Sequence, residues 1–165
     1  MLDDDLAHGE HKLNIKLPRA LSSLKYRDYS LFSAGQLISL TGTWMQNTAQ
    51  GWLVYELTGS EILLGVVAAM TTIPVLFLTL PAGTIADRWP KRKLLLVTQT
   101  VLLIQALLLG LLDSTGTIKV WHILTLALIA GIANAMDAPA RQSFTVDLVG
   151  KEDLLNGIAL NSAIF

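Results

Sequence analysis

The chain has 165 residues, of which 52% are hydrophobic and only 15% are charged. Its net charge of -1 gives no electrostatic basis for binding nucleic acid, and the absence of cysteine excludes disulfides, thiolate metal sites and cysteine nucleophiles. Together with a mean hydropathy of +0.52, this composition is more apolar than one soluble core of this length needs, so it predicts a membrane protein.

Residues 1–24 are polar and of mixed charge, and they begin with Asp3, Asp4 and Asp5. They lack the basic-then-apolar order of a secretory signal, so we expect a cytosolic tail. His8 and His11 lie in this tail, but no cluster of acidic or thiol ligands completes a metal site around them. No metal or other cofactor is therefore expected.

Residues 25–165 contain four long apolar stretches and the start of a fifth, at about 29–55, 62–86, 94–112, 120–138 and 154–165. A helix needs roughly 20 largely apolar residues to cross a bilayer, so the first four stretches are predicted to span it. A terminal carboxylate inside hydrocarbon is costly to solvate, so we expect the fifth to continue past Phe165 in a longer protein. The predicted fold class is an all-α, polytopic membrane bundle.

The first span carries a polar stripe. At 100° per residue six amide and hydroxyl side chains fall within an arc of about 100°, and these are Gln36, Ser39, Thr43, Gln46, Asn47 and Gln50. Polar side chains at membrane depth normally face a bundle interior or a watery cavity, so we predict that the stripe lines a solute path. The alternative is hydrogen bonding between helices without any ligand.

The second span contains Pro74 and Pro81, which break its backbone hydrogen bonding and make it able to flex. A short basic turn follows at residues 88–93. Of the 12 Lys and Arg residues, Lys119 alone falls on the far side of the predicted topology. The positive-inside rule then places the N-terminus and this turn in the cytoplasm, as in a protein of a bacterial inner membrane.

The third and fourth spans are followed by an amphipathic segment. Gln105 and His122 are candidates for proton relay, but a hydrogen-bonded glutamine and an interfacial histidine are the simpler interpretations. In the fourth span Ala127, Gly131 and Ala135 form a small-residue ridge that favours close helix packing. After Pro139 we expect a separate short helix lying along the cytoplasmic surface of the membrane.

The basic turn also carries a motif. It resembles the signature that follows the second helix in the major facilitator superfamily, Gly-x-Leu-Ala-Asp-Arg-x-Gly-Arg/Lys-Arg/Lys, through Gly83, Ile85, Ala86, Asp87, Arg88, Lys91 and Arg92. Ile85 stands in place of the usual leucine, and Pro90 replaces the second glycine and stiffens the turn. Four further segments resemble the branch with siderophore (enterobactin-type) and drug exporters: residues 39–45, 52–60, 137–142 and 154–162.

This resemblance implies a twelve-helix transporter of two six-helix halves that works by alternating access, with this chain supplying part of the first half. It further implies a conformational latch formed by Gly83, Asp87, Arg88, Lys91, Arg92 and Asp137, in which Lys91 bridges toward Asp137. The alternative is that the basic residues only set topology. Some proton-coupled members of the superfamily carry an arginine within the fourth span, and this chain has none there. Proton coupling is therefore implied by the family resemblance alone.

We therefore predict export of a small amphipathic solute of the drug or siderophore type. The expected partners are this solute, protons, the lipid bilayer and the remaining helices of a longer transporter. An enzyme is not expected, since the spans contain no nucleophile-base pair and no His-Glu-x-x-His motif. The competing hypothesis is a four-helix accessory or scaffold membrane protein that moves nothing.

Overall fold

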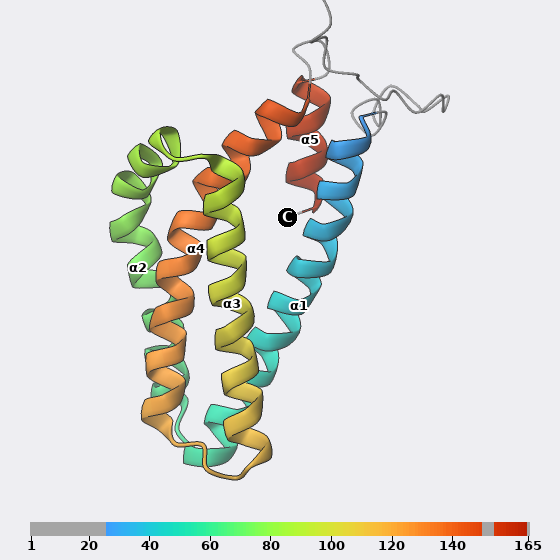
Figure 1. Ribbon diagram of the computed structural model, residues 1–165. Coiled ribbons are helices and arrows are strands. Elements are labelled where there is room, and N and C mark those ends of the chain that lie inside the picture. Colours follow the sequence, from blue (N-terminus) through green and yellow to red (C-terminus); the bar gives the residue numbers. More distant parts are fainter. Residues whose placement is uncertain (1–25, 150–153, 165) are drawn as a thin grey trace, which may run out of the picture. The chain divides into compact units, whose positions relative to one another are not determined.

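The computed structural model describes residues 26–149 and 154–164, and its regular elements are α-helices (Figure 1). They are α1 Arg27–Thr58, α2 Glu61–Arg88, α3 Lys91–Ser114, α4 Val120–Leu148 and α5 Leu154–Ile164. The predicted all-α fold class is confirmed. The predicted tail at residues 1–24 lies outside the described residues.

Tight turns join the first four helices. Gly59 follows α1 with a φ of 60°, and Gly116 follows α3 with a φ of 65°, a left-handed conformation that glycine adopts at no steric cost. Ser60 caps the N-terminus of α2 by accepting a hydrogen bond from the Leu63 amide at 3.4 Å. Links this short make consecutive helices run antiparallel.

The chain divides into two compact units. One contains the described residues 26–40, 145–149 and 154–164, and the other contains residues 41–144. Helices α1 and α4 contribute to both, so each unit is described by itself below; the second is called the four-helix unit.

Helices α2, α3 and α4 run side by side in the four-helix unit, where they are joined by the C-terminal part of α1 (Figure 1). Its buried apolar cluster takes side chains from all four helices, and the cluster consists of Val54, Val67, Leu109, Ile123, Leu126 and Ala127. Helix α4 packs closely against α2 at Gly131. A Cβ added there would lie 2.6 Å from the Thr71 carbonyl oxygen, so only glycine fits this contact.

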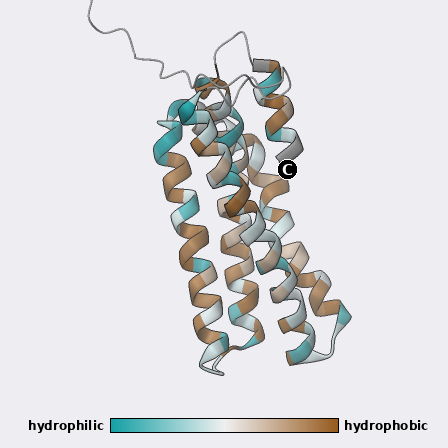
Figure 2. Ribbon diagram, turned by 90° about the vertical axis from the view of Figure 1, so that its right-hand side faces the viewer, coloured by the Kyte–Doolittle hydropathy of each residue, from teal (hydrophilic) through white to brown (hydrophobic). Residues whose placement is uncertain are grey.

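Three of the described helices are long and apolar enough to cross a membrane: Glu61–Ile85, Lys91–Ser114 and Val120–Leu148. Most of their length is hydrophobic (Figure 2). Many of their apolar side chains are exposed, for example Leu80 at 84% and Ile62 at 80%, as suits helices whose solvent is lipid. Helix α1 is also long, with 32 residues, but its polar stripe keeps it outside this group. Its crossing of the membrane stays a prediction.

Helix α4 differs from the expected arrangement around Pro139. We expected the fourth span to end near residue 138 and a separate helix to follow, but α4 continues without a break to Leu148. Proline removes one backbone donor from a helix, which the rest of the helix tolerates when side chains support it. Here Asp137 and Arg141, one on each side of Pro139, form a buried ion pair along α4.

The other unit brings the start of α1 together with α5. Tyr29 is 1% exposed, and its hydroxyl donates a hydrogen bond to the Gly157 carbonyl oxygen at 2.9 Å. Gly157 also packs against Val149, where an added Cβ would lie 2.9 Å from the valine Cγ2. The absence of a side chain at Gly157 therefore permits the close approach of Val149.

Candidate solute cavity

A cavity of about 420 Å³ lies inside the four-helix unit. Helices α1, α2, α3 and α4 all contribute to its wall, and Val67 belongs both to this wall and to the buried apolar cluster. Leu64 and Val67 of α2 and Leu102 of α3 supply apolar surface. A cavity with mixed polar and apolar walls between helices of a bundle is a common setting for a small-molecule site.

Four residues of the predicted polar stripe line this cavity. They are Thr43, Gln46, Asn47 and Gln50, which the 3.6-residue period of α1 places on one side of the helix. Gln50 is 6% exposed, Thr43 and Gln46 are half-buried, and Asn47 is exposed. The stripe therefore presents both buried and exposed polar side chains to the cavity.

The opposite wall carries Gln105 in the middle of α3. It is 2% exposed, and its Oε1 accepts a hydrogen bond from the Nε2 of Gln46 at 2.7 Å. The Nε2 of Gln105 has no hydrogen-bond partner among the residues that the structure describes. One polar atom in the cavity wall is thus buried without a hydrogen-bond partner among the described residues, which is unusual in a folded protein.

The cavity is polar without being charged. Thr71 of α2 and Asn134 of α4 complete its polar wall, and no ionisable residue is found among the described residues that line it. Amides and hydroxyls both donate and accept hydrogen bonds, so such a wall can orient a solute without supplying a counter-charge.

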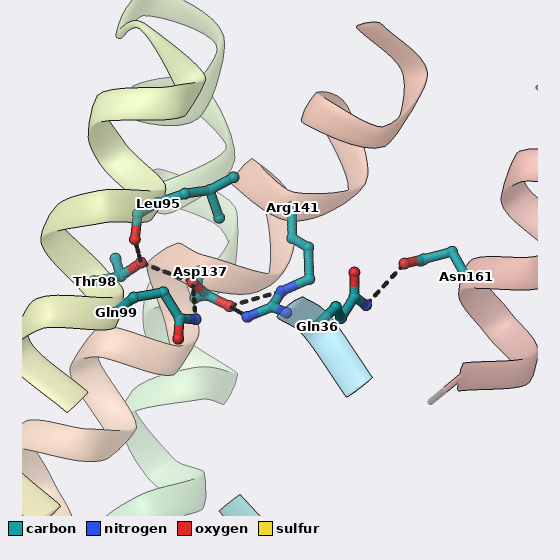
Figure 3. A network of polar contacts seen from close by, with 7 residues as sticks. All are labelled: Gln36, Leu95, Thr98, Gln99, Asp137, Arg141 and Asn161. Carbon is teal, nitrogen blue, oxygen red and sulfur yellow. Dashed lines mark hydrogen bonds and ion pairs between the residues drawn. The ribbon is translucent and has the colours of Figure 1, made fainter. Parts of the chain in front are cut away.

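The remaining residues of the predicted stripe lie in the other unit. Gln36 is buried and donates from its Nε2 to the Oδ1 of Asn161 of α5 at 2.9 Å (Figure 3). Ser39 is half-buried. For Gln36 the contact is the interhelical hydrogen bond that was the alternative to a solute path.

The predicted latch residue Asp137 is the centre of a polar network between α3 and α4 (Figure 3). Its Oδ1 accepts hydrogen bonds from the Thr98 hydroxyl at 2.7 Å and the Gln99 Nε2 at 3.0 Å. Its Oδ2 accepts from the Nε of Arg141 at 2.9 Å and also from the guanidinium Nη2. Both partners of the ion pair are buried, at 5% exposure for Asp137 and 9% for Arg141.

The other predicted latch residues lie where α2 meets α3. Gly83 is half-buried in the last two turns of α2, Arg88 ends that helix, and Lys91 and Arg92 begin α3. Lys91 is not one of the three partners of Asp137 named above, so the bridge between them stays a prediction. The Asp87 side chain lies outside the described part of the structure.

His122 serves as a helix cap. Its Nδ1 accepts a hydrogen bond from the Lys119 amide at 3.1 Å, at the start of α4, and its ring lies 3.8 Å from that of Trp121. This is the capping arrangement in which a side chain in the first turn reaches back to the residue before the helix. No group of three or more metal-ligating residues occurs within the described ranges.

Several residues of the cavity and of the Asp137 network were not predicted from the sequence to have these roles. Gln105 was interpreted as a plain hydrogen-bonded amide, and Asn134 and Thr98 were not singled out at all. Asn134 lies one helical turn before Asp137, so a polar residue at this spacing in an apolar helix was a usable signal. Arg141 falls in the segment after Pro139 that was expected to form a separate surface helix, and its pairing with Asp137 requires that α4 continue through Pro139.

The sequence was then compared with known proteins. Residues 19–165 match the family described as transmembrane secretion effectors. The staphyloferrin A transporter of Staphylococcus aureus (strain NCTC 8325 / PS 47) is 31% identical over 134 residues, which cover 81% of this chain and 34% of that protein. The chain therefore spans about a third of the length of this relative. No solved structure was found to match the chain.

Proposed function

The chain belongs to the transmembrane secretion effector family of the major facilitator superfamily, and on this premise we propose that its protein exports a small amphipathic solute by alternating access. Family membership and the three apolar helices make it an integral, multi-pass membrane protein of a transporter family. We take the solute to be of the siderophore or drug type. The relative named for staphyloferrin A supports the siderophore type.

The observation that carries the proposal is the uncharged polar cavity of the four-helix unit. Burying several amides and hydroxyls in a bundle that faces lipid is unfavourable unless they bond to each other, to water or to a ligand. Gln46 forms a hydrogen bond with Gln105 across the cavity, and the Nε2 of Gln105 is buried without a hydrogen-bond partner among the described residues. Thr43, Gln46, Asn47 and Gln50 are proposed to line the solute path, and Gln36 and Ser39 to extend it.

The proposed transporter works as a larger helical bundle, of which these helices form part. The 134 matched residues make up 34% of the relative, so the relative is more than twice as long as this chain, which agrees with a protein of two six-helix halves. The exposed apolar side chains of the described helices would then face lipid or further helices. We propose that the protein sits in a bacterial-type cytoplasmic membrane with its N-terminus inside, and that protons drive export.

The proposed latch consists of Gly83, Asp87, Arg88, Lys91, Arg92 and Asp137, following the family resemblance. The burial of Asp137 between α3 and α4 supports a role for this carboxylate in holding one arrangement of the helices. Charged groups at helix ends can pair differently in the two states of a transporter, so a latch of this kind can form and break.

Transport by the full-length protein in proteoliposomes tests the proposal. We expect it to move staphyloferrin A or, as a drug-type solute, chloramphenicol, which is uncharged and carries oxygen acceptors, and we expect Asp87→Asn to reduce the rate strongly while the amount inserted in the membrane is unchanged. Asp113→Asn is the matched control, because it makes the same chemical change at an exposed position. Absence of movement of both solutes by wild-type protein would contradict export, and an unchanged rate for Asp87→Asn would remove the latch.

A further inference from the structure

The amide of Gln105 is held in one orientation within the cavity wall. Its Oε1 already accepts the hydrogen bond from Gln46 at 2.7 Å, so its Nε2 points away from that partner. This nitrogen is buried and has no partner among the described residues. A side chain that lines the cavity thus carries two N–H donors without an acceptor among the described residues.

Burying a donor without an acceptor is unfavourable, and a ligand that supplies the acceptor removes this cost on binding. The complementary group is an oxygen acceptor, such as a carbonyl, carboxylate, ether or hydroxyl oxygen. An ammonium group fits poorly, because it only donates hydrogen bonds and the described cavity wall holds no carboxylate to balance its charge.

We propose that Gln105 is a specificity-determining residue that donates a hydrogen bond to an oxygen acceptor of the solute, so that the cavity selects acceptor-bearing amphiphiles over amine cations. Gln46 is the positioning residue that fixes the orientation of the Gln105 amide. The inference rests on the proposed export function, because it names the chemical class of solute that the same cavity takes.

The test compares two probes that share an octyl chain. N-octylpyrrolidone carries a carbonyl acceptor and no N–H donor, whereas octylammonium only donates. Binding of each radiolabelled probe to the full-length protein in lipid nanodiscs is measured after subtraction of binding to empty nanodiscs. We expect the wild-type protein to bind N-octylpyrrolidone more tightly, and equal or tighter binding of octylammonium would overturn the proposal without any variant.

Two substitutions sharpen the test. Gln105→Met keeps the size of the side chain but removes its donors, so N-octylpyrrolidone should bind roughly 3- to 10-fold more weakly, the effect of one hydrogen bond. Gln105→Glu replaces the donors with acceptors, so the preference should reverse toward octylammonium. Gln142→Met, at an exposed position of α4, is the control and should change neither affinity. Unchanged N-octylpyrrolidone binding by Gln105→Met would overturn the proposal.

Binding and transport fail in different ways. Loss of probe selectivity with intact transport would contradict only the role of Gln105, whereas selective binding that depends on Gln105 without any transport in proteoliposomes would contradict only the export function.

Discussion

At the scale of single residues, two buried polar side chains of the four-helix unit differ in how many of their hydrogen-bonding atoms have partners. Asp137 accepts hydrogen bonds from Thr98, Gln99 and Arg141, and its charge is balanced within the protein. Gln105 has one bonded oxygen and one unbonded nitrogen. A satisfied network rigidifies the bundle, whereas an unsatisfied donor is open to a ligand.

Asp137→Asn removes the negative charge that balances Arg141. A buried guanidinium without its partner destabilises a protein by about 3 to 5 kcal/mol, so we expect a loss of this order in the free energy of unfolding. Titration with sodium dodecyl sulfate in mixed micelles, followed by circular dichroism of the helices, measures it.

The double substitution Asp137→Asn with Arg141→Met is the informative comparison for this network. It removes both charges, so part of the lost stability should return, because an apolar pair costs no desolvation of charge. A double variant that is less stable than Asp137→Asn alone would show that Arg141 contributes through something other than this ion pair.

At the scale of the elements, glycine and proline set how closely α2 and α4 pack. Pro74 cannot donate to the Met70 carbonyl one turn earlier, which leaves that oxygen without its helical bond. Gly131 of α4 packs against this stretch, with the position of an added Cβ 3.0 Å from both the Met70 oxygen and the Pro74 Cγ. Two long helices of this unit therefore meet backbone to backbone.

Gly131→Ala should push these helices apart. The added methyl group would meet backbone oxygens, which cannot rotate away, so we expect a loss of about 1 to 3 kcal/mol in the free energy of unfolding. Gly110→Ala in α3 is the control, since nothing lies within 4 Å of its added Cβ and alanine favours helix by roughly 0.5 to 1 kcal/mol. Equal effects of the two substitutions in the same detergent titration would contradict the close contact.

At the scale of the whole molecule, the proposed membrane orientation rests on the basic residues that end α2 and begin α3. Trp89 in this turn is 59% exposed, and Ser114 at the far end of α3 is also exposed. The positive-inside rule predicts that these two positions lie on opposite sides of the membrane. Because the chain contains no cysteine, a cysteine introduced into it reports its own position.

We expect Ser114→Cys to react with a membrane-impermeant maleimide in intact cells, and Trp89→Cys to react only after the membrane is permeabilised. Labelling of the protein without an introduced cysteine gives the background. Reaction of Trp89→Cys in intact cells would reverse the proposed orientation, and with it the cytoplasmic placement of the latch.

The helical class of this protein follows from the long apolar stretches of its sequence, because a segment that crosses lipid as a helix bonds its backbone polar groups within itself. The sequence also determined the polar face of α1, because the period of the helix fixes which residues share a side. Neither result needs knowledge of contacts between helices.

The partners of these polar residues are known only from the tertiary structure. It assigned Gln36 to Asn161 and Gln46 to Gln105, and it paired Asp137 with Arg141 through a helix that continues past Pro139. The two amide pairs depend on which faces of separate helices meet, which is set by packing between residues far apart in the chain, whereas the ion pair depends on the continuation of α4 past Pro139. The helical period in the sequence fixes which residues share a face of one helix. A contact between helices also requires that two such faces be turned toward each other, which the period of one helix does not specify.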